Sequence, residues 1–457
     1  PIYHHGWVAS EQQSYRFSIQ SMTSVALIVL DTLRQDAFAE NFNWLPGARF
    51  EQCYSTSHWT VPAHASLFTG RYASEVGTYA KSSHLQDGYP TLGELTVDRK
   101  SRFYSANPQM AYHEGWTTNF DEVMSPWEVK HPDSCHLVDW DDFAVNCDKE
   151  GLPRYLEAVK AAARHDGPTL RSLWKGYKAS IHDHTDVDDS GAVAILDRIR
   201  NADVEDDEFI FLNLMEAHGP YDPPAEYRSV EADVNPVFAD KWSNDAPDPD
   251  VARRAYEDAV DYLSDIYREI FAELESAYDV VVTVSDHGEL LGEHGHWNHV
   301  HGVYPELTHV PLVISGVDVP AENTEKVVNL LDVHQTVAEL LGVSDESQGR
   351  GESLLEPVSD KPRYTEFHGL PTWINGQLQR TGVSDVYDRY NEPLFGVCLP
   401  DGSYGYQSVD GDRGDVPEKQ LDRQIRSHTN TVPTDFSRSS MEVDDSIREQ
   451  LEDLGYA

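Results

Sequence analysis

Three apolar runs of the sequence end directly in acidic or histidine side chains. The first is followed by Asp31, the second by Glu216 and His218, and the third by Asp286 and His287. Side chains of these types carry metal-binding and acid-base chemistry. Each residue alone could equally be a turn former or a helix cap. In open α/β sheets, however, ligands bind where the strands end, so the joint placement predicts one polar site at three strand ends.

A fourth segment, residues 57–71, carries a hydroxyl group at the expected start of a helix. Its sequence is SHWTVPAHASLFTGR. Pro62 fits the first turn of a helix that continues through Phe68, so Thr60 lies at or just before the helix N-terminus. A helix N-terminus stabilises negative charge. Thr60 is therefore either an ordinary N-cap, the more frequent role, or a side chain placed beside an anion.

Apolar runs and amphipathic helical patterns alternate along the chain. Continuous apolar runs are typical of strands that are buried on both faces. Alternation of strands and helices predicts a layered α/β sheet with mostly parallel strands. The expected strands are 24–30, 209–215, 279–285 and 310–315, and the expected helices include 151–164, 192–200 and 251–277.

Seven blocks of the chain resemble, in order, the sulfatases of the alkaline phosphatase superfamily. The resemblance runs from residue 24 to the C-terminus, with unfamiliar insertions between the blocks, especially over 120–190. It covers LDTLRQD at Leu30, TVPAHASLFTGR at Thr60, HGPYDPP at His218, SDHGE at Ser285, GEHGHW at Gly292, VPL at Val310 and LEDLGY at Leu451.

The resemblance implies an α/β fold of two parts. These are an alkaline-phosphatase-like layered α/β/α domain with a mixed central sheet and a smaller C-terminal antiparallel-sheet subdomain. We assign residues 22–370 to the catalytic domain and residues 371–457 to the C-terminal subdomain. Residues 1–21 form an N-terminal extension.

The resemblance also implies roles for individual residues. Asp31, Asp286 and His287 match ligands of one divalent metal ion, and Thr60 matches the nucleophile. His218 matches the histidine that contacts the transferred anion.

Two regions differ from the family where it places lysine or histidine contacts. After the GEHGHW block, where a lysine is frequent, the chain reads Asn298-His299-Val300-His301, so either His299 or His301 replaces it and could protonate the leaving group. The Lys-x-His element of the family is absent, and Asn107 stands in its place. We therefore predict Asn107 as a substrate contact.

The nucleophile region departs from the usual sulfatase pattern. The family has Cys or Ser, which is oxidised to formylglycine, and an arginine four residues on; this chain has Thr60 and His64. The extra methyl group of threonine leaves no simple route to the aldehyde hydrate, so we predict a covalent Thr60 ester without formylglycine. We predict His64 as a substrate contact. These features are similar to the threonine-nucleophile branch, which includes phosphoglycerol transferases and nucleotide phosphodiesterases.

The expected metal ligands also differ from those of calcium-binding members. Thr32 replaces the second aspartate of an Asp-Asp pair, and His287 replaces an asparagine. Imidazole in place of oxygen shifts the preference from Ca²⁺ toward Mn²⁺ or Zn²⁺.

The composition excludes several partners. The 457 residues carry 79 Asp and Glu against 35 Lys and Arg, a net charge of -44. This excludes a nucleic-acid binder that works by phosphate neutralisation, and the overall field repels anionic membranes. Such acidity is typical of a haloarchaeal-type protein in a high-salt cytoplasm, where charges are screened. No apolar run is long enough for a membrane span. We expect a cytoplasmic location, and the alternative is export directed by a leader that has been removed.

Together these features predict a metal-dependent hydrolase or transferase of phosphate or sulfate esters. A threonyl ester must be attacked at its central atom, which favours phosphate esters. The substrate is an anionic ester, either small or linked to a glycan or lipid. The alternative is a catalytically inactive sulfatase-fold protein with a surface or assembly role, because Thr32, His64 and the missing Lys-x-His element are what loss of activity would look like.

Overall fold

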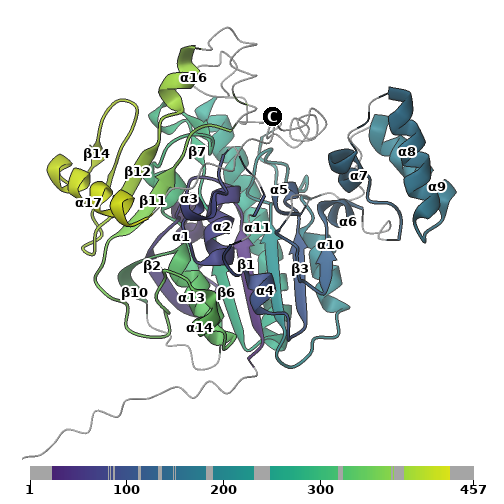
Figure 1. The fold of residues 1–457 in the computed structure, drawn as a ribbon, viewed down its shortest axis with the longest axis horizontal. Helices are drawn as coiled ribbons and strands as arrows, with labels where there is room; N and C mark the ends of the chain where they lie inside the picture. The colour runs from purple at the N-terminus through teal and green to yellow at the C-terminus, as the bar shows by residue number, and fades with distance from the viewer. Residues whose placement is uncertain are drawn as a thin grey trace, which may run out of the picture.

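Strand β1 (Val25–Leu30) runs through the middle of the fold, and all six of its side chains are fully buried. Its even-numbered residues pack with helices α10 (Ala192–Arg200) and α11 (Pro249–Ala277). Its odd-numbered residues pack with α2 (Thr60–Thr69) and α13 (Leu330–Leu340). Because strand side chains alternate between faces, helices cover both faces of the sheet, as Figure 1 shows.

The computed structural model describes residues 23–432, apart from 81, 83, 86–87, 112–114, 132–135, 148, 150, 182–188, 231–247, 317–322, 372–373 and 375–384. The predicted extension 1–21 and the LEDLGY block lie outside the described residues.

The central sheet has eight strands in the order β10-β2-β9-β6-β1-β5-β3-β4. Five of its neighbouring pairs are parallel, and β9 is antiparallel to both β6 and β2. The sheet is therefore mixed and mostly parallel. The remaining strands are β2 (Ala48–Tyr54), β3 (Ser101–Ser105), β4 (Glu122–Met124), β5 (Phe209–Leu214), β6 (Val280–Val284), β9 (Leu312–Gly316) and β10 (Thr324–Asn329).

A second, antiparallel sheet follows, with strands β11 (Arg363–Phe367), β12 (Leu394–Cys398), β13 (Tyr404–Tyr406) and β14 (Arg413–Gly414). Helix α17 (Glu418–Thr431) packs on it through Leu421 and Ile425. The buried carboxylate of Glu366 joins the two, because it accepts a 2.6 Å hydrogen bond from His428 Nε2. The predicted fold class is confirmed. The small sheet begins at Arg363, and the proposed division at residue 371 stays a prediction.

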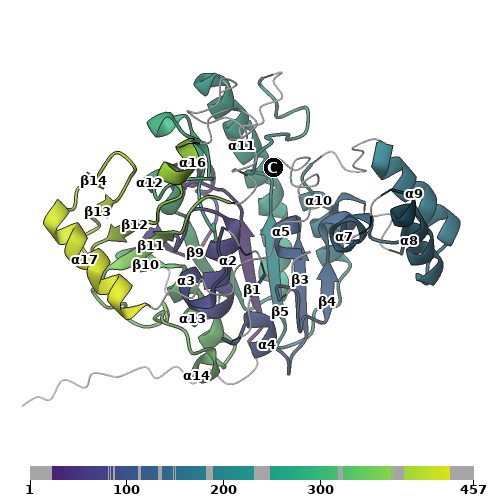
Figure 2. The same cartoon turned by 45° about the horizontal axis from the view of Figure 1, so that its top comes forward.

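A run of four helices occupies the region between β4 and α10. These are α6 (Pro126–Lys130), α7 (Trp140–Asn146), α8 (Gly151–Arg164) and α9 (Thr169–Ile181). In Figures 1 and 2, α8 and α9 lie at one end of the molecule and α17 lies at the other. Within the described part of the chain, no helix has the length and apolar character needed to cross a membrane.

The shorter elements connect these layers. They are α1 (Gln35–Asn41), α3 (Ala73–Val76), α4 (Leu92–Leu95), α5 (Pro108–Ala111), α12 (Pro305–Thr308), α14 (Ser344–Ser347), α16 (Asp385–Tyr390), the pair β7 (Leu290–Leu291) and β8 (Trp297–Asn298), and the 3₁₀ helix η3 (Glu293–Gly295).

Candidate active site

The carboxyl ends of three adjacent strands carry the predicted site. Strand β1 pairs in parallel with both β5 and β6, so these three strands end at one edge of the sheet. Asp31 follows β1, and Asp286 and His287 follow β6 after one residue. Their ligand atoms lie within 4.8 Å of one another, and all three side chains are fully buried.

Asp31 and Asp286 each use one carboxylate oxygen to accept protein N–H groups. Asp31 Oδ2 accepts from the side-chain amides of Asn107, at 2.9 Å, and Asn213, at 3.1 Å. Asp286 Oδ1 accepts from the backbone N–H groups of His287, at 2.9 Å, and Thr32, at 3.3 Å. The other oxygens, Asp31 Oδ1 and Asp286 Oδ2, have no hydrogen-bond donor among the described residues. The hydrogen bonds thus fix the orientation of both carboxylates, and one oxygen of each stays available for another ligand.

The imidazole of His287 is oriented toward these free oxygens. Its Nδ1 donates to the Gly288 carbonyl at 2.9 Å. Burial, and then His299, hold the pKa of His287 well below its usual value, so the ring is neutral and Nε2 carries a lone pair. Nε2 lies 3.3 Å from Asp286 Oδ2 and 3.7 Å from Asp31 Oδ1.

These three residues fit a divalent cation. Two buried carboxylates repel each other, and burial together with Asp31 raises the pKa of Asp286 well above its usual value. A cation between the free oxygens and His287 Nε2 would relieve that repulsion. The amide and backbone donors behind them would fix the ligand orientation, as is usual around metal sites.

Thr60 places its hydroxyl beside this cluster. Helix α2 begins at Thr60, and Pro62 lies in its first turn, as the sequence predicts. Thr60 Oγ1 lies 3.3 Å from His287 Nε2 and 3.4 Å from Asn107 Nδ2. The side chain is therefore held between the proposed cation site and an amide donor, at the positive end of a helix.

His64 lies one turn further along α2 and faces the same cluster. Its Nδ1 donates to the Thr60 carbonyl at 2.9 Å and lies 3.4 Å from Asp286 Oδ2. Burial lowers the pKa of His64 to about 4, so the ring is neutral near pH 7. His64 thus links the start of α2 to Asp286.

The backbone at Thr32 is strained. Its φ of 59° lies in the left-handed region, which costs a β-branched residue about 1–3 kcal/mol. Tyr256 Oη donates to the Thr32 carbonyl at 3.0 Å, while the Thr32 N–H donates to Asp286. The bend therefore gives Asp286 one of its two backbone donors.

Three histidine rings, those of His287, His299 and His218, lie next to one another at the site. The His299 ring lies 4.5 Å from that of His287 and 5.0 Å from that of His218, measured between centroids. His299 Nδ1 contacts Glu289 Oε1 at 3.1 Å. The Nδ1 of His218 donates to the Gly219 carbonyl, and burial followed by His299 lowers the pKa of His218.

His301 lies in a different group of rings. Its centroid is 4.9 Å from Tyr390, 5.0 Å from Phe367 and 5.3 Å from His296. Of the two histidines that the sequence left as alternatives, the structure brings His299 to the cluster of Asp31, Asp286 and His287 and packs His301 among aromatic side chains.

Two residues of the site were not predicted from the sequence. Asn213 shares the Asp31 oxygen with Asn107, and its signal was an amide within the apolar strand β5. His58 is buried two residues before Thr60, and its ring lies 4.7 Å from that of Phe367. Burial, and then His299, lower its pKa well below the usual value. Nothing in the local sequence around His58 indicates that it belongs to the site.

Comparison with known proteins identifies the family. The model of the sulfatase family matches residues 34–343, which is more than half of the chain. The chain therefore belongs to the sulfatase family.

The relatives and solved structures agree with this assignment. The chain is 22% identical over 395 residues to the "Uncharacterized sulfatase YidJ" of Escherichia coli, covering 76% of this chain and 74% of the relative. It is 29% identical over 200 residues to the "Low-salt glycan biosynthesis sulfotransferase Agl7" of Haloferax volcanii, covering 42% of this chain and 43% of that protein. The phosphonate monoester hydrolase SpPMH from Silicibacter pomeroyi has the same fold, with a TM-score of 0.57 and 16% identity over 91% of this chain and 97% of that structure.

Proposed function

We propose that this protein is a metal-dependent hydrolase or transferase of phosphate or sulfate esters that works through a covalent Thr60 ester, without formylglycine. The observation that carries the proposal is the position of Thr60 Oγ1, 3.3 Å from His287 Nε2 and next to the Asp31–Asp286 pair. A hydroxyl at a helix N-terminus beside a proposed cation site is well placed to become a nucleophile.

Asp31, Asp286 and His287 would hold the cation. When bound there, a divalent ion supplies Lewis-acid charge and lowers the pKa of a neighbouring hydroxyl. With an imidazole among the ligands, Mn²⁺ or Zn²⁺ is favoured over Ca²⁺.

The chain's own residues account for the two chemical steps. The deprotonated Thr60 oxygen forms a bond to the phosphorus or sulfur atom as the bond to the leaving alkoxide breaks. Protonated His299 gives its proton to that alkoxide, and Glu289 stabilises the charged ring. Neutral His299 then takes a proton from water or an alcohol, whose oxygen attacks the same atom and releases Thr60.

The negative charge of the reacting group has several donors nearby. Asn107 Nδ2 lies 3.4 Å from Thr60 Oγ1, and the first N–H groups of α2 have no partner within the helix. We assign His218 to the transferred anion, whose negative charge favours a protonated ring with Nε2 as the donor, because Nδ1 already donates to the Gly219 carbonyl. His64 contacts Asp286 and the Thr60 carbonyl, and we propose that it positions both residues. We also propose that it contacts the substrate.

The reaction at Thr60 favours phosphate over sulfate esters. A sulfated aldehyde hydrate can break down by eliminating sulfate, whereas a threonyl ester is released only by attack at the central atom. The fold does not decide between them, because phosphonate hydrolases and glycan sulfatases share it. We propose an anionic ester substrate that is small or linked to a glycan or lipid.

The acidic composition favours the assignment of this chain as a halophilic protein of a high-salt cytoplasm. With a net charge of -44, self-repulsion is tolerable only where salt screens it. An anionic substrate then meets the proposed cation and the start of α2 within an acidic surface. Activity should require high salt.

A catalytically inactive scaffold is the weaker candidate. An inactive protein would have no need of two buried carboxylates that, among the described residues, each accept two N–H groups on one oxygen and none on the other. The donor at Thr32 is its backbone N–H, so the replacement of the family aspartate does not remove it.

A panel of substrates tests the proposal. Wild type, Thr60→Ala and Thr60→Ser proteins are purified in high salt, loaded with Mn²⁺ or Zn²⁺, and given phosphomonoesters, phosphodiesters and aryl sulfates, with and without glycerol as acceptor. We expect Thr60→Ala to lose at least about 10³-fold in turnover and Thr60→Ser to keep measurable activity. Undiminished turnover by Thr60→Ala would refute the mechanism, and bound metal with no turnover on any ester would favour the inactive scaffold.

A further inference from the structure

Helices α8 and α9 expose a group of large apolar side chains. Leu170 is 84% exposed, Tyr155 is 73% exposed and Trp174 is 60% exposed. The other members are Leu156, Val159 and Tyr177. Both views place the two helices side by side at the edge of the molecule (Figures 1 and 2). Within the group the Trp174 and Tyr177 rings lie 5.9 Å apart, and adjacent exposed apolar side chains indicate a binding surface. We call these six residues the hairpin patch.

In α9 the patch lies opposite the face that packs on the protein. Leu170, Trp174 and Tyr177 follow the i, i+4, i+7 spacing of one helix face. Gly176 lies on the other side, where an added Cβ would come within 2.5 Å of the Trp140 ring. The backbone carbonyl of Ser172, on that same side, accepts from Trp140 Nε1 at 2.9 Å. The patch therefore faces away from α7.

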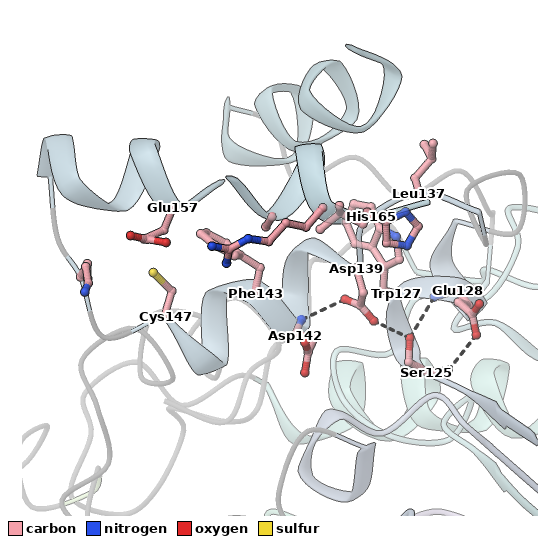
Figure 3. Close-up of a pocket in the computed structure, with 14 residues that line it drawn as sticks. Ser125, Trp127, Glu128, Leu137, Asp139, Asp142, Phe143, Cys147, Glu157 and His165 are labelled. Carbon is pink, nitrogen blue, oxygen red and sulfur yellow. Dashed lines mark hydrogen bonds between the residues drawn. The ribbon is translucent and has the colours of Figure 1, made fainter. Parts of the chain in front are cut away.

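In α8 the patch also turns away from the rest of the protein. Glu157, Ala161 and Arg164 line a cleft of about 830 Å³ between α8 and the α6–α7 segment, which Figure 3 shows. Tyr155, Leu156 and Val159 do not line this cleft and are 73%, 58% and 49% exposed. The cleft is lined by charged and apolar groups together, whereas the patch side carries the large apolar residues.

The charge of this segment is opposite to that of the chain. Residues 149–181 contain seven Lys or Arg against three Asp or Glu, within a chain whose net charge is -44. Lys160 and Arg171 are exposed on α8 and α9. Basic amphipathic helices with Trp, Tyr and Leu on the apolar face are typical of binding to an anionic membrane surface.

A second copy of the chain fits this patch less well. Elsewhere in the described residues the large apolar side chains that are exposed are Val97, Val123 and Val193, which form no comparable receiving surface. Contact between two hairpin patches would bring two basic segments together. An anionic bilayer satisfies both features, because its interface takes apolar side chains and its headgroups are negative.

We propose that α8 and α9 dock this protein on an anionic lipid surface, with the hairpin patch in the interface and the neighbouring Lys and Arg side chains at the headgroups. The docking does not depend on the chemistry at Thr60. In high salt both the repulsion by the overall charge and the attraction of the basic hairpin are screened, so burial of the hairpin patch carries the docking, and the Lys and Arg side chains add to it as the salt is lowered.

Vesicle flotation tests this proposal with the full chain. The vesicles contain phosphatidylglycerol and phosphatidylcholine, or phosphatidylcholine alone, and the salt is the lowest that keeps the protein folded by circular dichroism. The variants are Leu170→Ser/Trp174→Ser for the patch and Lys160→Glu/Arg171→Glu for the charge. The matched control is Val97→Ser/Val193→Ser, which removes exposed apolar side chains outside the hairpin.

We expect wild type and the valine control to float with the anionic vesicles. The fraction of the patch variant that floats should be lower by at least about tenfold. The charge variant should lose binding most at low salt. Absence of wild-type binding, or equal binding by the patch variant, would overturn the proposal. A dimer in analytical ultracentrifugation that requires the patch, without vesicle binding, would overturn it in favour of a second copy.

Discussion

The strand-end site and the α8–α9 hairpin are opposite exceptions to the rule that apolar side chains are buried and polar side chains are exposed. At the site, Asp31, Asp286 and His287 are charged or polar groups buried completely. On the hairpin, Leu170 and Trp174 are large apolar groups exposed to solvent. Buried polar groups and exposed apolar patches are the informative exceptions to hydrophobic burial. We propose a cation as the partner of the first region and a lipid surface as the partner of the second.

The two regions also differ in how firmly they are held. The site residues follow central strands, and each proposed carboxylate ligand has two N–H donors. The hairpin is joined to the body through a few contacts such as the one between Trp140 and Ser172. Changes at the site should therefore alter catalysis without affecting membrane binding, and changes on the hairpin should do the reverse.

The largest expected effect comes from Asp286→Asn. The substitution keeps an acceptor for the two backbone N–H groups and removes the negative charge that would hold the cation. We expect turnover to fall by at least about 10³-fold and the metal content, measured by elemental analysis, to fall well below one ion per chain. Vesicle flotation should be unchanged. Full metal occupancy in Asp286→Asn would refute the assigned ligand set.

The next effect separates His299 from His301. His299 lies beside His218 and His287, whereas His301 packs among aromatic rings. We expect His299→Ala to lower turnover about 10²-fold, with smaller losses for esters whose leaving groups are good, because the proton donor matters least for them.

His301→Ala is the matched control for His299→Ala. It should lower the free energy of unfolding, measured with urea, and leave the initial rate of turnover nearly unchanged. If His301→Ala lost more turnover than His299→Ala, the assignment of the proton donor would be wrong.

The smallest effect concerns Glu216, at the end of β5. Its carboxylate is buried and accepts the Ala192 N–H at 2.8 Å, and burial together with Asp189 raises its pKa to about 8. The folded state therefore holds this proton more tightly than the unfolded state. As pH rises from about 4.3, the unfolded pKa, toward 8, the free energy of unfolding should fall by at most about 1.4 kcal/mol per pH unit.

Glu216→Gln tests that slope, because glutamine keeps the acceptor for Ala192 and does not titrate. Urea unfolding at several pH values in this range should show a smaller loss of stability for the variant than for wild type. Identical slopes in the two proteins would mean that Glu216 does not titrate as assigned.

Much of the site could be predicted from local sequence. Apolar runs located β1, β5 and β6 to within one residue at each end, and Pro62 indicated the start of α2 at Thr60. These features depend on burial and backbone preferences, which neighbouring residues determine. The alignment of strand ends then placed Asp31 and Asp286 together.

The rest depends on contacts between distant segments. The choice between His299 and His301 required the positions of Glu289 and Phe367, and Asn213 became a site residue only because β5 lies beside β1. The periodicity of residues 151–164 predicted α8, but no local pattern says whether its apolar face is covered. That outcome requires the whole fold.

The most direct test of the central claim is to trap the covalent ester on Thr60. Wild type and Thr60→Ala proteins are quenched in acid during turnover of an ester with a good leaving group, digested, and analysed by high-resolution mass spectrometry. We predict that the wild-type peptide containing Thr60 gains one phosphoryl or sulfuryl group, located on Thr60 by fragmentation. Turnover with no modified Thr60 peptide at any quench time, or the same modification in Thr60→Ala, would contradict the account.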